Sequence, residues 1–443
     1  MLHVGQVPPR NHSLTYSLRV FPGAGKHGEG LGVEHVFTTQ DHEDLRQRVR
    51  EFAERVVRPL IPDMEESRTA LVGLSRLIAQ QGWIGATIDP VYGGMGAGHL
   101  AKTIIIEELA RVSGAMGAMV QASQLGVAKI IHFGDETQKR HWLPRIASGE
   151  VLPTIAVTEP GSGGHVAGME SSAVRDGDDY ILNGRKVFVG NSHVGDLHGV
   201  IVRTGPGSKG MTAFLVESDR PGFSLAPQVP SMGLHGFSFG ELVFDDCRVP
   251  AANRLGEEGE GLAVAYSSSV LYGRLNLTAV SLGIHQAVFE ETSRYCRETQ
   301  RYGKPLGHLP NIKIELGRML QRLTLARQSA YLAAHLLDNG RPCDVELMAA
   351  KLFNVESSIE SAQAAVKMHA ATGLFTDRPV ERYLRDAFHI YAPAGTSEIQ
   401  GLRLGEFALG ENKGEWSERL SHLVRSPQSV SRETELDPVG ELV

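Results

Sequence analysis

The sequence contains few of the residues that mark disulfide-rich, metal-binding or redox-motif proteins. It has only three cysteines among 443 residues, Cys247, Cys296 and Cys343. No pair has the CxxC spacing of a redox or zinc motif, and three thiols cannot form a disulfide framework. We therefore expect no metal site and a reducing compartment, the cytoplasm.

Long apolar runs and an excess of basic charge are also absent. No stretch of about 18 or more apolar residues occurs, so no membrane-spanning helix and no membrane partner are expected. The 44 basic and 51 acidic side chains give a net charge of −7, which argues against a nucleic-acid binder that uses a basic face. With 42% hydrophobic and 21% charged residues, the chain is typical of a globular protein, and its length predicts two or three folding units.

Residues 1–40 differ in composition from the rest. Pro8-Pro9 and closely spaced glycines leave no room for a long periodic segment, and no acidic residue occurs before Glu29. Transit peptides are also poor in acidic residues, but the prolines disfavour the amphipathic helix that such a peptide needs. We expect an N-terminal extension, with a family-specific segment favoured over a targeting sequence.

A helical period of apolar residues follows over 41–150. From Leu45 to Val56 these residues recur at spacings of four, three and four, and Thr39 or Asp41 can cap the helix. Further helical segments follow, separated by glycine-rich breaks. The pattern predicts an N-terminal helical domain.

The period changes to two at Val151. Short segments rich in β-branched and aromatic residues follow, and the pairs Asp176-Gly177 and Asn183-Gly184 are typical of hairpin turns. The pattern predicts an antiparallel β-domain over 151–258. The clearest expected strands are Tyr180–Leu182, Val187–Val189, Gly199–Val202, Ala213–Val216 and Leu242–Phe244.

Long helical patterns fill residues 259–412. One runs from Ile312 to Leu337, and the next begins at an Asp344 cap and is predicted to end at Gly373. Long helices with short connections predict a C-terminal four-helix bundle, followed by a polar tail over 413–443. The fold class is therefore α+β, with a β-domain between two helical parts.

Six motifs occur in a fixed order along this framework. Together they resemble the acyl-CoA dehydrogenase family of FAD enzymes over about residues 40–412, and they imply that family's three-domain fold. The motifs are Thr158-Glu159-Pro160-Gly161-Ser162-Gly163, Asn183–Asn191, Glu241–Pro250, Arg301–Leu306, Val380–Ala387 and Gly395–Gln400.

The resemblance implies that the central motifs bind the flavin. Val157 and Thr158 match residues that contact the polar edge of the isoalloxazine ring. Ser162 and Gly163 match positions near the pyrophosphate, and Phe188 matches the aromatic residue that backs the ring. Gly190 stands where the family commonly has a hydroxyl that bonds flavin N5.

The C-terminal motifs imply further contacts and an oligomer. Thr396 and Glu398 match positions near FAD, while Arg301, Tyr302 and the segment starting at Lys367 match parts that reach the FAD of a neighbouring subunit. A homodimer or homotetramer is therefore expected. Within that segment Ala370-Ala371 replaces a pair of glycines. Arg274 matches a helix arginine that borders the acyl-thioester channel.

The proton-transfer apparatus departs from the family pattern. The family's base is a Glu directly before Gly-Thr, where this chain has Ala394. Some members carry the base before an Arg-Leu pair, where this chain has Gly273. The catalytic base is therefore unknown. Tyr391 and His389 are weak candidates, and Tyr391 would lie one turn from Ala394 if the segment were helical.

Three hypotheses about function follow. The first is an FAD-dependent oxidoreductase that acts on an acyl thioester of CoA or an acyl-carrier protein, with an altered or relocated base and an undefined electron acceptor. The second is a flavin-dependent monooxygenase, and the third is a non-redox thioester-binding protein. Tyr272-Gly273-Arg274 also resembles a segment of acyl-carrier relatives in polyketide extender-unit pathways, which points to specialised metabolism.

Overall fold

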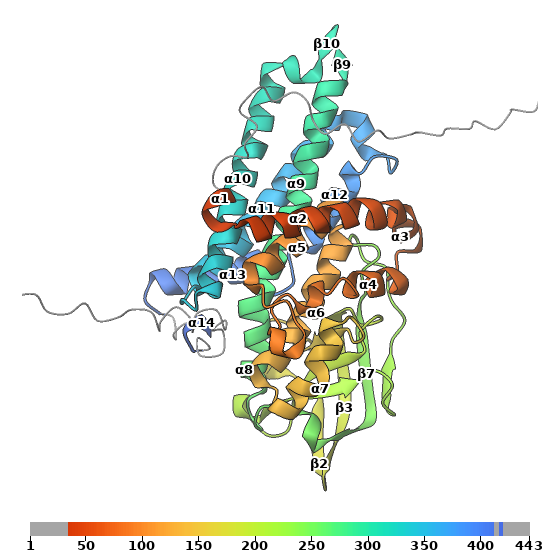
Figure 1. Cartoon of the computed structure of the whole chain (residues 1–443), viewed down its shortest axis with the longest axis vertical. Coiled ribbons are helices and arrows are strands. Elements are labelled where there is room, and N and C mark those ends of the chain that lie inside the picture. Colours follow the sequence, from red (N-terminus) through yellow and green to blue (C-terminus); the bar gives the residue numbers. More distant parts are fainter. Residues whose placement is uncertain (1–33, 412–415, 420–443) are drawn as a thin grey trace, which may run out of the picture.

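The computed structural model describes residues 34–411 and 416–419. Most of the expected N-terminal extension and nearly all of the expected tail lie outside these residues. The described chain has an N-terminal helical part, a central sheet and a C-terminal helical part (Figure 1). The predicted α+β fold with a β-domain between two helical parts is confirmed.

The N-terminal part is helical, as its apolar period predicts. Its helices are α1 (Glu34–Phe37), α2 (Gln40–Phe52), α3 (Ile61–Ser67), α4 (Val72–Ala79), α5 (Gly98–Val112), α6 (Gly114–Phe133) and α7 (Glu136–Ala147). Thr39 caps α2 and forms a capping box with His42.

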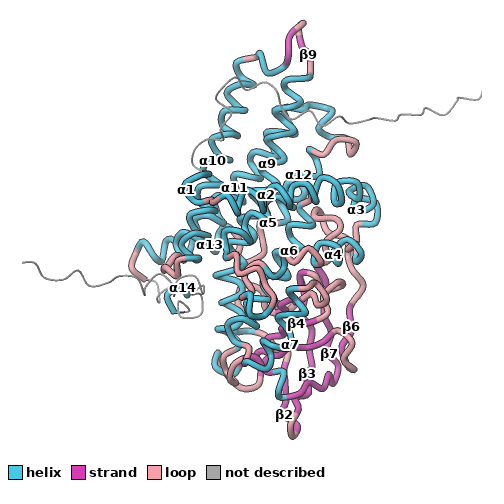
Figure 2. The backbone as a smooth tube through the Cα atoms, viewed as in Figure 1, coloured by secondary structure: helices cyan, strands magenta, loops and turns pink. Residues whose placement is uncertain are grey.

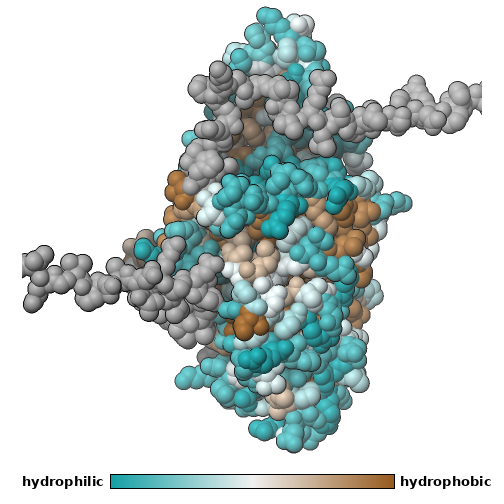
Figure 3. Space-filling view, viewed as in Figure 1, coloured by the Kyte–Doolittle hydropathy of each residue, from teal (hydrophilic) through white to brown (hydrophobic). Residues whose placement is uncertain are grey.

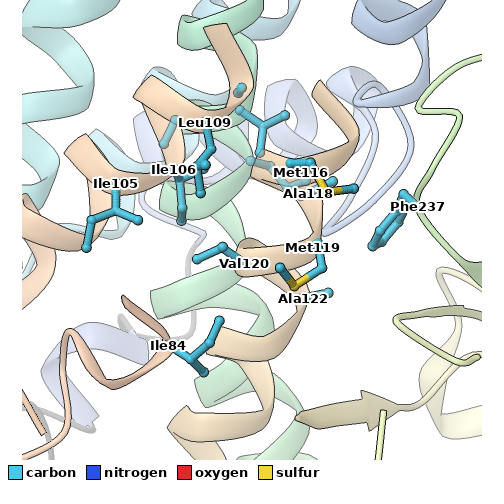
Figure 4. Close-up of a cluster of buried hydrophobic side chains, with 14 of the residues drawn as sticks. Ile84, Ile105, Ile106, Leu109, Met116, Ala118, Met119, Val120, Ala122 and Phe237 are labelled. Carbon is cyan, nitrogen blue, oxygen red and sulfur yellow. The ribbon is translucent and has the colours of Figure 1, made fainter. Parts of the chain in front are cut away.

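Helices α5 and α6 form the centre of the molecule. Their side chains are buried on nearly every face, as expected of helices surrounded by protein. Figure 4 shows part of this core, with Ile105, Ile106 and Leu109 on α5 facing Val120 of α6. Helix α6 also packs against the sheet and the C-terminal helices. One helix therefore contacts all three parts of the fold.

The sheet is mostly antiparallel, with strand order β6-β7-β3-β2-β4-β5-β8 (Figure 2). Its strands are β1 (Pro153–Ala156), β2 (Ser172–Asp176), β3 (Asp179–Gly190), β4 (Leu197–Arg203), β5 (Met211–Glu217), β6 (Phe223–Leu225), β7 (Phe239–Pro250) and β8 (Arg254–Leu255). Two pairings depart from the expected antiparallel pattern, because β1 and β2 each run parallel to β4.

One of the two predicted hairpin turns is correct. Asp176 pairs with Asp179, and Gly177 has φ +62° in the tight turn between them. The turn predicted at Asn183-Gly184 is wrong, because these residues lie inside β3, where its pairing with β7 shifts register. A Cβ at Gly184 would overlap the Ser171 side chain, so this glycine allows a close approach at a bulge.

The C-terminal part contains the long helices that the sequence predicts. Its elements are α8 (Gly261–Tyr266), the π-helix η8 (Ser267–Gly273), α9 (Arg274–Glu298), β9 (Gln300–Arg301), β10 (Lys304–Pro305), α10 (Pro310–Asp338), α11 (Asp344–His369), α12 (Val380–His389), α13 (Ser397–Ala408) and α14 (Trp416–Arg419). Helices α9, α10 and α11 pack against one another, and α12 packs on α9 and α11.

The end of α11 differs from the prediction. The helix stops at His369, four residues before Gly373, and Ala370 takes the positive φ of +50°. Gly373 has a different role, because a Cβ there would lie 2.7 Å from the carbonyl oxygen of Val366. The glycine is needed for packing against α11 instead of for ending it.

The surface in Figure 3 is largely hydrophilic over the β-domain, with apolar patches over the helical parts. Within 34–411 and 416–419, none of the helices has both the length and the apolar character that crossing a membrane requires.

Candidate active site

Phe188 stands at a bulge in β3. The register between β3 and β7 shifts between Lys186 and Val189, and Phe188 has φ +56°. A bulge redirects a side chain, and Phe188 is 63% exposed while its ring stacks on Phe239 with centroids 5.6 Å apart. An exposed aromatic face on a paired strand fits the flat, apolar isoalloxazine ring of FAD.

A buried ion pair braces the strand end before Thr158. Lys186 Nζ donates to Glu159 Oε1 at 2.6 Å and to the Val157 carbonyl at 3.1 Å. Glu159 also accepts the N–H groups of Glu170 and Ser171. Although burial favours its neutral form, these donors lower the pKa of Glu159. This pair was not among the predicted site residues, although Glu159 and Lys186 both lie inside the sequence motifs.

The glycine-rich loop after Thr158 has backbone groups with open space beside them. The Thr158 hydroxyl makes no hydrogen bond to the described residues, and a Cβ at Gly163 would meet nothing within 4 Å. Ser162 is buried, and its hydroxyl donates to the His165 carbonyl at 2.6 Å. Ser162 therefore stabilises the loop, while Gly163 and Thr158 leave groups accessible to a cofactor.

Gly190, the position predicted to lack the family's hydroxyl, has little space for a side chain. A Cβ there would lie 2.9 Å from Ala122 Cβ and 3.0 Å from Phe237 Cζ. Phe237 reaches α6 from the loop before β7, close to Met119 and Ala122 (Figure 4). An apolar ring fills the space next to this strand end.

The two positions predicted to have lost the family's base, Gly273 and Ala394, lie against each other. A Cβ on Gly273 would stand 3.2 Å from Ala394 Cβ and 3.6 Å from Leu125 Cδ2. Leu125 lies on α6 three residues after Ala122, so both contacts fall on one face of that helix. The structure thus brings Gly190 of the β-domain to the same side of α6 as Gly273 and Ala394 of the C-terminal helical part.

The turn at Ala394 is held by side chains on both sides. Ala394 has φ +53° and Gly395 has φ +92°. Gln400 Nε2 donates to the Ala394 carbonyl at 2.8 Å, and Lys351 Nζ donates to the carbonyls of Gly395 and Tyr391. None of the hydrogen bonds among the described residues uses the Ala394 N–H as donor. A backbone N–H held in place without an acceptor can polarise a carbonyl oxygen.

The helical geometry assumed for Tyr391 is wrong, because α12 ends at His389. The Tyr391 hydroxyl donates to Glu398, and this bond raises the pKa of Tyr391, so the phenol stays protonated at neutral pH. Burial lowers the pKa of His389 to about 4, and its ring lies 5.2 Å from that of Phe239. His389 is therefore neutral at neutral pH and lies against Phe239, the residue on which Phe188 stacks.

The remaining predicted cofactor residues fall in two other places. Thr396 caps α13, which carries Glu398. Arg301 and Tyr302 form the β9–β10 hairpin at the end of the molecule opposite the sheet, and Tyr302 is 92% exposed (Figure 1). Lys367 lies near the same end, where His369 stacks on Tyr295 of α9 with centroids 4.0 Å apart.

Three family models match nearly all of the described chain. The N-terminal, middle and C-terminal domains of acyl-CoA dehydrogenase match residues 39–150, 154–247 and 259–409. The chain belongs to the acyl-CoA dehydrogenase family. It is an FAD-dependent flavoenzyme of the acyl-CoA dehydrogenase type that acts on acyl thioesters.

Relatives in this family match most of the length of this chain. It is 34% identical to an acyl-CoA dehydrogenase of Bacillus subtilis over 84% of this chain and 99% of the relative. A glutaryl-CoA dehydrogenase of Mycobacterium smegmatis in complex with FADH2 has a TM-score of 0.80 at 27% identity, covering 85% and 96% of the two chains. The prolyl acyl carrier protein oxidase AnaB has a TM-score of 0.79 at 29% identity, covering 84% and 99%.

Proposed function

We propose that this member of the acyl-CoA dehydrogenase family binds acyl thioesters next to Ala394 but dehydrogenates simple saturated acyl-CoAs slowly. The observation that carries the proposal is the contact between Gly273 and Ala394. The two positions that hold a carboxylate base elsewhere in the family lie next to each other. Neither Gly273 nor Ala394 has a side-chain group that can accept a proton.

The parts of the site that bind and polarise a thioester are retained. The Ala394 N–H has a fixed direction, because Gln400 and Lys351 hold the neighbouring carbonyls. The α-proton of a thioester is very weakly acidic, so loss of the general base slows its removal by about 10²–10⁴-fold. The proposal therefore separates binding, which is kept, from proton transfer, which is impaired.

The assignment of cofactor residues depends on the fit between the isoalloxazine ring and the exposed Phe188 ring. FAD would place its ring on Phe188 and its polar edge at Val157 and Thr158, and it would supply hydride acceptance from the β-carbon. Thr396, Glu398, Ser162, Gly163 and Gly190 complete the proposed cofactor surface. The carrier, CoA or an acyl-carrier protein, and the electron acceptor are left for experiment.

We further propose a homodimer or homotetramer. Arg301 and Tyr302 belong to the β9–β10 hairpin, which lies at the opposite end of the molecule from the sheet, and Lys367 lies in the last turn of α11 (Figure 1). Within one subunit the hairpin therefore does not reach the proposed flavin surface on the sheet. Exposed Leu374 adds apolar surface at this end. Light scattering on the FAD-loaded protein is expected to give twice or four times the 48.0 kDa chain mass. A monomer with bound FAD would contradict the assignment.

A second candidate function is flavin-dependent monooxygenation. Gly190 and the Phe237 ring leave no side-chain hydroxyl at the position that commonly bonds flavin N5, which is compatible with chemistry other than dehydrogenation. Turnover that requires both O2 and NAD(P)H would support this candidate. We also propose a reducing compartment, the cytoplasm, because Cys247, Cys296 and Cys343 are buried and form no disulfide within the described residues.

The deciding experiment is anaerobic mixing of the FAD-loaded enzyme with butyryl-CoA. Bleaching of the flavin is expected to be slow in the wild type and at least tenfold faster in Ala394→Glu. Ala394→Gln is the matched control, because it adds the same volume without a base and should stay slow. Fast bleaching by the wild type would overturn the proposal.

A further inference from the structure

Gln121 lies one helical turn from the contact between Gly273 and Ala394. Leu125 is the α6 residue beside Gly273, and residues four apart on a helix are neighbours on one face, so Gln121 shares the face of Leu125. On the facing helix, Asn276 follows Gly273 by three residues, and its Nδ2 donates to the Gln121 carbonyl at 3.4 Å. The same spacing of one turn therefore separates Gln121 from this contact on both helices.

The residues just before Gln121 point to other sides of α6. Val120 faces α5, and Met119 lies close to Phe237 of the β-domain (Figure 4). Successive residues of an α-helix are turned by about 100° from one another, so Gln121 points to neither of these sides. It points toward the side on which Leu125 meets the C-terminal helical part. The Gln121 side chain is therefore directed toward the proposed acyl site.

The Gln121 amide has no protein partner. The residue is only 6% exposed, and within the part of the chain that the structure describes its side-chain amide makes no hydrogen bond, although neither amide atom is fully enclosed. Gln124 on the same helix is the contrast, because its Nε2 donates to the Ile84 carbonyl at 2.8 Å and its Oε1 accepts from Thr87. Burying a polar group without a partner costs free energy, so the Gln121 amide favours a ligand that supplies one.

The surroundings of Gln121 favour an uncharged partner. Its neighbours on this face of α6, Ala118, Ala122 and Leu125, are apolar, and the two alanines are small enough to leave room beside the amide. An amide can donate and accept a hydrogen bond, but it cannot neutralise a charge. A carboxylate or an ammonium group placed here would be buried without a counterion, which is costly. A neutral oxygen that accepts from Gln121 Nε2 has no such cost.

We propose that Gln121 determines substrate specificity by donating a hydrogen bond to a neutral oxygen, a hydroxyl or a ketone, on the acyl chain. This inference rests on the proposed function, because it assumes that the thioester carbonyl binds at the Ala394 N–H. One helical turn is about 5.4 Å long, which an extended chain spans in about four bonds. The glutamine side chain covers part of this distance, so the oxygen is carried by the fourth, fifth or sixth carbon, counted from the thioester carbonyl.

The test compares thioesters that differ by one ketone oxygen. The wild-type holoenzyme is titrated calorimetrically with 4-oxopentanoyl-, 5-oxohexanoyl- and 6-oxoheptanoyl-CoA, each paired with the saturated acyl-CoA of the same length, and with free CoA as the reference. The ketone gains a hydrogen bond, whereas the saturated chain leaves the amide buried without a partner. At least one ketone thioester should therefore bind roughly five- to hundredfold more tightly than its saturated counterpart.

Three variants locate the preference. Gln121→Leu has a similar volume but no donor, so it should lower the preference to twofold or less. Its thermal unfolding midpoint should stay the same or rise, because no hydrogen bond of the protein is lost. Gln121→Asn keeps a shorter amide and should retain part of the preference. Gln81→Leu, at an exposed position after α4, is the matched control and should keep all of it. Flavin content shows whether each variant is folded.

The outcomes separate this inference from the proposed function. Equal affinity for both members of every pair overturns the inference, and slow bleaching by butyryl-CoA would still leave the proposed function standing. A preference that survives in Gln121→Leu also overturns it, as does a lower unfolding midpoint of that variant, which would show a structural role. Fast bleaching by butyryl-CoA, or the absence of binding by all six thioesters, overturns the proposed function and the inference together.

Discussion

The Lys186 ammonium group lies 2.6 Å from the Glu159 carboxylate, buried beneath the strand end that carries Thr158. The same ammonium group donates to the Val157 carbonyl. The ion pair therefore fixes the backbone that is proposed to face the flavin edge. The Lys186–Glu159 ion pair thus fixes the position of the uncharged backbone at Val157.

Replacing Lys186 with Met should weaken FAD binding. The substitution leaves the Glu159 charge buried and unpaired, which typically costs about 3–5 kcal/mol of folding free energy. The loss of these contacts should loosen the backbone at Val157 and Thr158, so the flavin affinity measured by fluorescence should drop at least tenfold. The double variant Lys186→Met with Glu159→Gln should recover part of the stability. Unchanged flavin affinity in the single variant would contradict this role.

Introducing a base at Gly273 should succeed less well than at Ala394. A Cβ at Gly273 stands 3.2 Å from Ala394 Cβ, closer than an ordinary van der Waals contact, so the turn must move. Gly273→Glu is expected to destabilise the protein by about 1–3 kcal/mol and to bleach flavin more slowly than Ala394→Glu. Urea unfolding and anaerobic bleaching measure both effects, and the reverse order of rates would refute the packing argument.

Replacing Ala370 with Gly should stabilise the enzyme. Ala370 ends α11 with φ +50° and ψ −136°, a sparsely populated region that costs a non-glycine residue about 1–3 kcal/mol. The entropy cost of a glycine is about 0.5–1 kcal/mol, so a net gain between zero and about 2 kcal/mol is expected. Ala371→Gly is the control, because Ala371 has no positive φ and should only lose stability. Calorimetric unfolding measures both variants.

Stability should fall in mild acid because two buried histidines are held neutral. Burial, with a smaller effect of Lys129, lowers the pKa of His198 to about 3, and burial lowers that of His285 to about 3. The unfolded chain takes up these protons below about pH 6.5, whereas the folded chain does so only near pH 3. Stability is therefore retained above about pH 6.5 and decreases progressively below it.

The size of this effect can be measured on one histidine. Between pH 7.5 and 5.5 the proton uptake at His198 should cost about 1.4 kcal/mol of unfolding free energy. His198→Asn should remove that share from urea unfolding curves, while His141→Asn, at an exposed position on α7, should leave the pH dependence unchanged. An identical pH dependence in His198→Asn and wild type would show that His198 is not held neutral.

The sequence alone predicted the order of the three domains, the long C-terminal helices and the family. These features depend on local periodicity and on motifs whose spacing is visible along the chain. The α10 pattern, for example, ends at Leu337, and the helix ends at Asp338. The sequence also predicted that Ala394 and Gly273 replace the family's carboxylates, because a residue's identity at a motif position needs no coordinates.

Only the tertiary structure decided how the site is assembled. Asn183-Gly184 has the composition of a turn, yet pairing with β7 keeps it in a strand, because long-range hydrogen bonds override local preference. The contact between Gly273 and Ala394 joins residues 121 positions apart through the packing of η8 against the turn before α13. Burial likewise left Lys351 with the carbonyls of Tyr391 and Gly395 as its hydrogen-bond partners, and burial depends on what the whole fold places around a residue.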